Sequence, residues 1–321
     1  MLTRCQRSPS FNMSCKSLKK PNLGAEIGNE TIQTGVGVGD KRQTFNVHKT
    51  LLQKNTKFFD TSLASETGKI GFIFLNDEDP DVFRMISDWF YTGELPKPPT
   101  KISVRSPPSL AEMNRLGDDL RARFDAAETK LVDVYSLAEK WDMKNLMNCA
   151  IDTIQDGFLD YGTVFGPALL VKIFEVTKYG SQLRELCIAV NVIHTDRGCC
   201  KLRRKLEIAS YATPGFLTAM LTWTSRNFAL IARRASEGYD VRKPREGFSP
   251  LNRKALCPCH FHTHGPGEAH KQHKKCAIPY LKCGHEEPTE GVAPMEASPM
   301  DIKIDLSALT FSINGKEFKK H

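Results

Sequence analysis

The sequence lacks the features that mark membrane and exported proteins. None of its apolar runs approaches the roughly 20 residues that a transmembrane helix needs, so we expect no membrane span. Residues 1–22 contain no apolar stretch of the signal-peptide type, and we therefore do not expect secretion. No internal repeat is visible along the 321 residues.

What is present is the composition of a globular protein, with 40% hydrophobic and 26% charged residues. The length allows two ordinary domains, or one domain with appendages. Ten cysteines would suit a disulfide scaffold only in a short exported chain. Here they indicate reduced thiols, so we expect a cytoplasmic or nuclear location.

The formal charge of +8 is confined to one part of the chain. Residues 1–95 are nearly neutral, with 12 Lys and Arg against 11 Asp and Glu. Residues 184–254 carry 14 basic against 6 acidic residues. Because a nucleic-acid binder would spread its charge over the fold, this distribution argues against a nucleic-acid partner. The basic run at residues 197–205 also contains leucines and is best interpreted as a helix with one solvated face.

Alternation and helical spacing outline a first compact block. Ile32, Thr34, Val36 and Val38 alternate with small or polar residues, which predicts a strand. Residues 39–41 are typical of a turn, and residues 44–47 and 70–75 of further strands. A helix is predicted from Asp79-Pro80 to Gly93, with a capping side chain, a proline in the first turn and a closing glycine.

The rest of the chain divides by composition. We expect a disordered N-terminus over residues 1–26 and a first domain over residues 27–160, interrupted by a proline-rich insertion over residues 96–128 that is helical near residues 110–124. Helical spacing resumes at Leu131, restarts at Asp142 and continues through a helical extension over residues 161–235. Residues 236–321 are expected to form a Cys/His-rich tail with little packed structure.

Several segments of the first domain resemble BTB/POZ domains. Residues 45–52 (FNVHKTLL) resemble the family's strand-to-helix signature, and residues 57–59 resemble its next helix. Residues 75–83 (LNDEDPDVF) with the following WFYTG, and residues 131–140 (LVDVYSLAEK), resemble its later elements in the same order. The form is most similar to short BTB proteins of filamentous fungi, over about residues 27–195.

The resemblance implies an α+β (mixed α/β) BTB/POZ fold, a small sheet packed on a helical cluster, followed by additional helices. It implies a scaffold for homo- or hetero-association, with protein partners, no catalytic residues and no small-molecule substrate. The residues we expect to carry contacts are Ile32, Val36, Val38, Phe58, Phe59, Phe83 and Tyr91. Two alternatives stay open: an adaptor that binds a cullin in a ubiquitin ligase, for which Ala64-x-Glu66 loosely resembles the hydrophobic-x-Glu pattern, and a chromatin-associated regulator with a zinc-bound tail.

Three motifs within the domain are interpreted structurally. Gly35, Gly37 and Gly39 lie within a strand and its turn, which is not the setting of a phosphate loop. His48 is expected to be a hydrogen-bonded structural histidine. The acidic residues between 77 and 81 lack the ligand spacing of a calcium loop and predict a turn and helix cap.

The stretch over residues 257–285 holds six of the 9 histidines and four of the 10 cysteines. Thiolates and imidazoles are the ligands that zinc prefers. The spacing matches no established zinc finger, so we favour a tail with adventitious metal affinity and expect no resident cofactor. The alternative is a zinc site with Cys257, Cys259, Cys276 and Cys283 as ligands and His260, His262 and His285 as substitutes.

Overall fold

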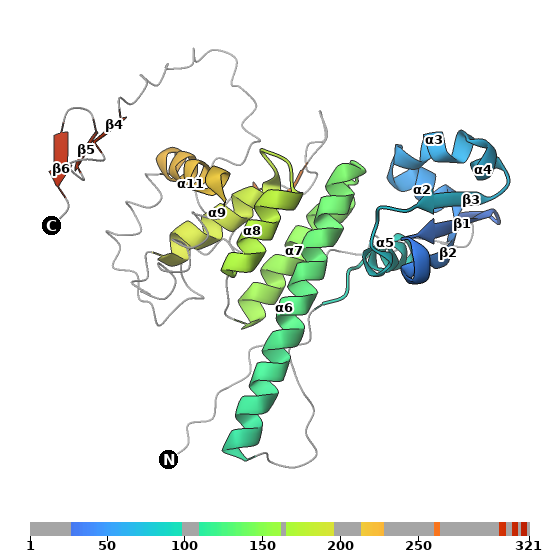
Figure 1. Cartoon of the computed structure of the whole chain (residues 1–321), viewed down its shortest axis with the longest axis horizontal. Coiled ribbons are helices and arrows are strands. Elements are labelled where there is room, and N and C mark those ends of the chain that lie inside the picture. The colour runs from blue at the N-terminus through green and yellow to red at the C-terminus, as the bar shows by residue number, and fades with distance from the viewer. Residues whose placement is uncertain are drawn as a thin grey trace. The chain divides into compact units, whose positions relative to one another are not determined.

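The computed structural model of the chain describes residues 27–97, 109–161, 165–195, 213–227 and 260–263, together with three short strands after residue 301 (Figure 1). The chain divides into two units, residues 1–284 and residues 285–321. No helix among the described residues is long and apolar enough to cross a membrane.

The first unit begins with a three-stranded sheet (Figure 1). Its strands are β1 (Thr31–Val36), β2 (Gln43–His48) and β3 (Phe72–Leu75), in the order β2-β1-β3. β1 runs antiparallel to β2 and parallel to β3. Along β1, the buried residues Ile32 and Thr34 alternate with the exposed Thr31 and Gln33, which confirms the predicted period of two.

The glycines after β1 shape the backbone between β1 and β2. Gly37 has φ 83°, a conformation that side chains other than glycine rarely adopt, and a Cβ atom there would lie 3.1 Å from Cγ of Pro80. Gly39 also has a positive φ and opens a 3-10 turn, η1 (Gly39–Lys41). The strand-and-turn interpretation of this glycine string is therefore confirmed.

Four helices pack around the sheet: α2 (Lys49–Asn55), α3 (Phe58–Ala64), α4 (Glu66–Lys69) and α5 (Pro80–Thr92). The predicted signals at both ends of α5 are confirmed. Oδ1 of Asp79 accepts hydrogen bonds from the backbone N–H groups of Asp81 and Val82, at 2.7 and 3.3 Å. Gly93 ends the helix in the left-handed conformation and donates to the carbonyl of Trp89.

Helix α6 (Leu110–Lys140) is longer than the sequence predicted. The helix expected near residues 110–124 is present, and it continues without a break to residue 140, where helical spacing had been expected from Leu131. Ser109 caps the helix by accepting from the N–H of Glu112, and Phe124 is already buried against Phe158 of the next helix. The proline-rich residues 98–108 lie outside the described part of the chain.

The helices that follow were all predicted from their spacing: α7 (Lys144–Tyr161), α8 (Pro167–Val176), α9 (Gln182–Thr195) and α11 (Pro214–Arg226). α7 and α8 pack on α6, and α9 packs on α8 and α11 (Figure 1). The sequence predicted that Asp142 starts helix α7. In the structure Asp142 instead lies in the turn before α7, with φ 53°. Arg184 of α9 joins α9 to the end of α8 by donating to the carbonyl oxygen of Phe174 at 2.6 Å and by lying over the ring of Phe174.

The second unit contains a three-stranded antiparallel sheet in a segment for which little structure was expected. Its strands are β4 (Ile302–Asp305), β5 (Thr310–Ile313) and β6 (Lys316–Lys319), in the order β4-β5-β6. Apolar and polar residues alternate in β4 and β5. The tail prediction overlooked this period because the surrounding residues are rich in proline, glycine and charge.

Candidate interaction surface

Four of the seven residues expected to carry contacts lie in the core. Ile32, Val36, Phe59 and Phe83 are at most 2% exposed. Their side chains pack inside the chain and are not available to a partner, so this part of the prediction is corrected. The physical reason is that a core and an interface draw on the same apolar residues, and spacing alone does not separate them.

The other three expected residues reach the surface to different extents. Val38 is 60% exposed and Phe58 is 37% exposed, whereas Tyr91 is half-buried. The ring of Phe58 also stacks on Trp141 of the turn after α6, with centroids 5.1 Å apart, and Thr56 donates to the Trp141 carbonyl. Phe58 therefore joins the sheet domain to α6 on one side and faces solvent on the other.

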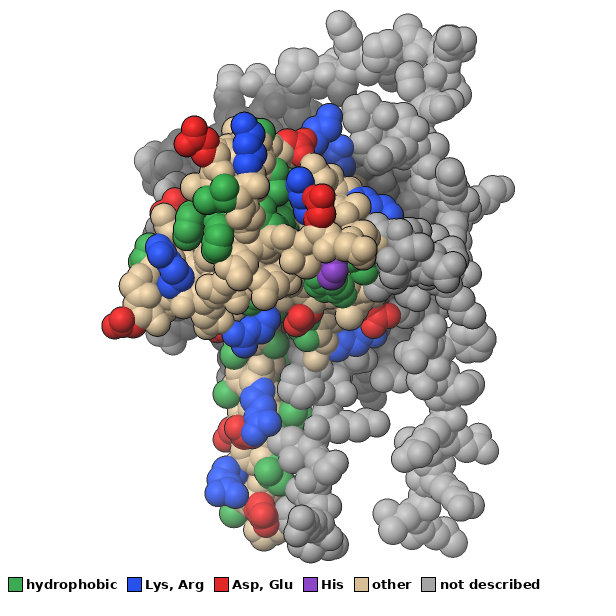
Figure 2. Space-filling model, turned by 90° about the vertical axis from the view of Figure 1, so that its right-hand side faces the viewer, with side chains coloured by type: hydrophobic (Ala, Val, Ile, Leu, Met, Phe, Trp, Pro, Cys, Tyr) green, Lys and Arg blue, Asp and Glu red, His purple; other side chains and the backbone are tan. Residues whose placement is uncertain are grey.

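The most exposed aromatic side chains of the described sheet are two that the sequence did not single out. Phe72 and Phe74 of β3 are 40% and 52% exposed, while the intervening Ile73 is buried. Residues two apart in a strand share a face, so both rings lie on the side of the sheet away from the core. Figure 2 shows the end of the molecule that carries the sheet, where hydrophobic side chains reach the surface in separate groups between charged ones. In β3 the residues that face the core and those that face outward are all apolar. The sequence pattern therefore could not show which pair is exposed.

Arg42 holds Phe74 in place on this face. Its guanidinium carbon lies 5.7 Å from the centre of the Phe74 ring, within the range of a cation–π interaction. Nε donates to the carbonyl of Gly37 and a terminal nitrogen donates to Oδ1 of Asn76, both at 3.1 Å. On the inner side, the ring lies over Gly35, where a Cβ atom would approach it to 3.2 Å. We call Phe72, Phe74 and Arg42 the aromatic sheet face.

Comparison with known families fits this architecture. A family model of the BTB/POZ domain matches residues 32–113, from β1 into the start of α6. The chain carries a BTB/POZ domain. No curated protein matches the chain.

The BTB/POZ domain is a protein–protein interaction module, and its family is not enzymatic. The match and the sheet with its surrounding helices confirm the fold that the resemblance implied. Within the matched range, the aromatic sheet face is the arrangement best suited to contact another protein, because it is apolar, exposed and rigidly supported.

His48 of the BTB/POZ domain has the structural role that was predicted for it. Its Nδ1 atom lies 2.9 Å from the hydroxyl oxygen of Tyr91, and its backbone N–H donates to the same oxygen at 3.3 Å. The two rings meet edge to face with centroids 5.8 Å apart. His48 thereby connects the end of β2 to α5.

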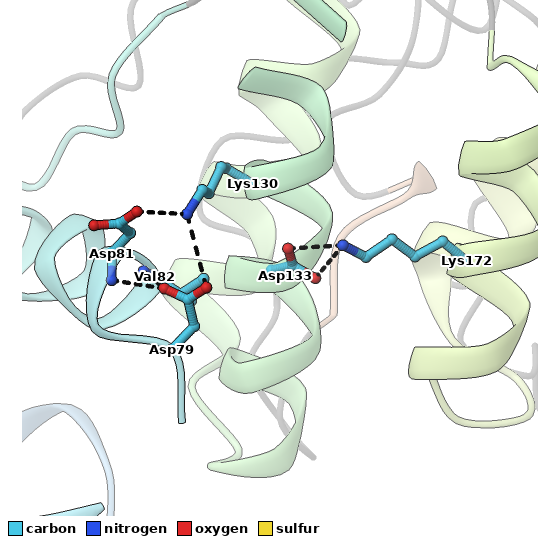
Figure 3. Close-up of polar contacts among 6 residues, drawn as sticks. All are labelled: Asp79, Asp81, Val82, Lys130, Asp133 and Lys172. Atoms are coloured by element: carbon cyan, nitrogen blue, oxygen red, sulfur yellow. Dashed lines mark hydrogen bonds and ion pairs between the residues drawn. The ribbon is translucent and has the colours of Figure 1, made fainter. Parts of the chain in front are cut away.

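The acidic turn before α5 connects the BTB/POZ domain to α6, as Figure 3 shows for two of its residues. Lys130 of α6 lies 2.9 Å from Asp81 and 3.8 Å from Asp79, and Lys140 lies 2.7 Å from Glu78. The hydrogen bond and the charge of Lys130 lower the pKa of Asp81. The turn-and-cap interpretation is confirmed, and the carboxylates bind lysines of the same chain.

Only part of the expected metal cluster lies in the described region. His260 and His262 are described, whereas Cys257, Cys259, Cys276, Cys283 and His285 lie outside it, as does the basic run at residues 197–205. No group of three or more metal-binding side chains is found among the described residues. His262 Nε2 lies 2.9 Å from Oδ1 of Asp152 in α7, so this imidazole already has a carboxylate partner.

Proposed function

We propose that this chain is a scaffold protein that self-associates through the aromatic sheet face of its BTB/POZ domain. The observation that carries the proposal is the pair of exposed rings, Phe72 and Phe74, on β3, which lies at the edge of the sheet in the order β2-β1-β3. Aromatic residues on a well-ordered support are enriched at protein interfaces because they bury much apolar area with little loss of side-chain freedom.

A second copy is the partner that this face suits best. In a two-fold dimer the same patch occurs on both copies, so the apolar area of one copy can pack against the apolar area of the other. A stable interface needs about 1,000 Å² or more of buried surface, which two rings alone do not provide. Ile70, two residues before Phe72 in the chain, is 73% exposed and adds to the apolar surface near the start of β3.

The double substitution Phe72→Ser with Phe74→Ser tests this proposal in the full chain. We expect dimerisation, measured by sedimentation equilibrium, to weaken by about tenfold or more, because both rings lose their apolar contact area. Tyr179→Ser is the matched control, since this aromatic ring is 94% exposed outside the BTB/POZ domain. Unchanged dimerisation of the double variant, or a wild-type chain that is monomeric at all concentrations, would overturn the proposal.

A second candidate function is that of an adaptor for a cullin-based ubiquitin ligase. Ala64 and Glu66 are both exposed at the junction of α3 and α4. Ser65 between them caps α4 by accepting from the N–H of Gly68 at 3.1 Å, which fixes the junction on the surface. This arrangement presents the hydrophobic-x-Glu-like pattern where a cullin could contact it.

Titration calorimetry of the full chain with the N-terminal domain of the host's BTB-associated cullin tests the adaptor role. We expect binding that Ala64→Asp with Glu66→Lys abolishes, because the variant removes both the apolar contact and the carboxylate. Asp40→Lys, an exposed charge reversal in η1, is the control that keeps binding intact. The absence of heat with folded wild-type protein would leave the scaffold as the function.

A further inference from the structure

A short segment from far along the chain is seated on α7. Residues 260–263 contact Asn148 and Asp152, which precede them by 115 and 110 residues. Phe261 is only 3% exposed and belongs to the same core cluster as the helices. The segment therefore contacts the helical core through specific groups rather than lying beside it.

Asn148 recognises the backbone of the segment. Its Oδ1 accepts from the N–H of Thr263 at 2.7 Å, and its Nδ2 donates to the carbonyl of the same residue at 3.1 Å. Both bonds go to main-chain atoms of one residue, so they do not depend on the threonine side chain. Pairing of this kind recognises the main chain of a peptide whatever the side chain of the paired residue.

Asp152 recognises the preceding side chain. Oδ1 of Asp152 lies 2.9 Å from Nε2 of His262, and the two side chains are only 13% and 10% exposed. Asn148 and Asp152 are four residues apart in α7, so they lie on the same helical face and meet neighbouring residues of the segment. A shielded contact of this kind favours histidine over side chains that cannot donate a hydrogen bond.

Phe261 supplies the apolar anchor. Its ring meets the ring of His260 edge to face, with centroids 4.5 Å apart. Burial of His260 lowers the pKa of its imidazole to about 4, so that near neutral pH it packs as an uncharged ring. An aromatic anchor, a side-chain contact and a backbone pair are the three parts of a peptide-recognition site.

We propose that α7 carries a peptide-binding site, formed by Asn148, Asp152 and the helical core that buries Phe261, whose ligand is the Phe-His-X sequence supplied by residues 261–263 of the same chain. The site ties the Cys/His-rich stretch to the helical core. Because the ligand is part of the chain, its effective concentration at the site is high, and a free peptide has to compete with it. This site is independent of the aromatic sheet face.

A labelled synthetic peptide of residues 258–266, with serine in place of Cys259, tests the site by fluorescence polarisation. The protein is the full chain with Phe261→Ala and His262→Ala, which frees the site without changing α7. We expect the peptide to bind this variant about tenfold or more tightly than wild type, and to lose binding when Asn148→Ala is added. Equal binding to all three proteins, or binding to none of them, would overturn the proposal.

Hydrogen exchange of the otherwise intact chain provides a second test that does not require displacement of Phe261. The amide of Thr263 donates to Asn148, so we expect Asn148→Ala to accelerate its exchange by about tenfold or more, with the amides of α8 unchanged. Asn46→Ala, an exposed position in β2, is the matched control. Rapid exchange of Thr263 in the wild-type chain would contradict the seated segment.

Discussion

At the scale of single residues, the buried polar groups of α6 differ in whether they have partners. Glu139 accepts a hydrogen bond from the N–H of Lys178 at 2.7 Å, and the hydroxyl of Tyr135 accepts one from Ser181 at 3.1 Å. Glu128 is 5% exposed, and its Oε1 atom has no hydrogen-bond partner among the described residues. A buried polar atom without a partner destabilises the fold, so Glu128 is the residue where pH should act most strongly.

The first prediction concerns the ionisation of Glu128. Burial and the charge of Asp125 raise its pKa from 4.5 to about 9, against the opposing charge of Arg121. The folded chain therefore binds a proton that the unfolded chain releases, and stability is greatest below pH 4.5 for this group and falls as pH rises to about 9. Glu128→Gln should remove this dependence and raise the free energy of unfolding by about 1–3 kcal/mol at pH 7.

Urea unfolding of wild type and variant at several pH values checks this prediction. Glu112→Gln is the control, because Glu112 is exposed in the first turn of the same helix. Parallel stability curves for wild type and Glu128→Gln between pH 5 and pH 9 would show that Glu128 is ionised in the folded chain.

At the scale of elements, α6 contacts both the helix that precedes it, α5, and the later helix α8. Lys130 of α6 binds the acidic turn before α5, and Asp133 binds Lys172 of α8 at 2.7 Å (Figure 3). Only the second half of α6 is buried, whereas residues such as Leu110 and Met113 near its start are 71% and 51% exposed. The exposed half therefore depends more on its own helix propensity than on packing.

The second prediction follows from that dependence. Gly117 lies in the exposed half of α6, and a Cβ atom there would meet nothing within 4 Å. Gly117→Ala should raise the free energy of unfolding by about 0.5–1 kcal/mol, because alanine loses less backbone freedom in a helix. Thermal unfolding followed by circular dichroism measures the change.

Gly68→Ala gives the opposite outcome and serves as the contrast. A Cβ atom at Gly68 would overlap the carbonyl of Ser62 and the backbone of Leu63. We expect this variant to lose about 1–3 kcal/mol of stability. An equal effect of both substitutions would show that glycine content, and not position, governs the helices.

The sequence predicted elements well where the signals were local. The cap, the proline and the closing glycine of α5 each act within one turn, so the structure reproduces them. The helix expected near residues 110–124 is present, but its continuation to residue 140 was not predicted, because the polar residues before Leu131 show no helical apolar spacing. In the second unit, the dipeptide Asn314-Gly315 between β5 and β6 is typical of a hairpin turn and could have revealed the sheet.

At the scale of the whole molecule, the question is whether cysteine and histidine side chains bind a structural metal ion. Cys149 and Cys187 are buried cysteines, and burial raises the pKa of the Cys187 thiol, so it packs as a neutral side chain. His262 contacts Asp152. Any zinc site would therefore have to use the other cysteines and histidines of residues 257–285, and we predict that they hold no resident zinc ion.

The third prediction is that the purified full chain contains far less than one zinc per chain. Elemental analysis after dialysis measures the zinc content, with Cys257→Ser and Cys259→Ser together as the comparison. One zinc per wild-type chain, lost in this variant, would establish the alternative in which Cys257, Cys259, Cys276 and Cys283 form a site.

The sequence by itself determined most helices and strands of the described part of the first unit and the presence of a BTB/POZ domain, because caps, turns and hydrophobic periods act over a few residues. Only the tertiary structure decided which apolar residues face outward. Phe59 and Phe72 are equally hydrophobic, yet one is fully buried and the other is 40% exposed. Only the tertiary structure also showed that Thr263 contacts Asn148, 115 residues earlier in the chain. This contact depends on packing between distant segments, so no local sequence pattern predicts it.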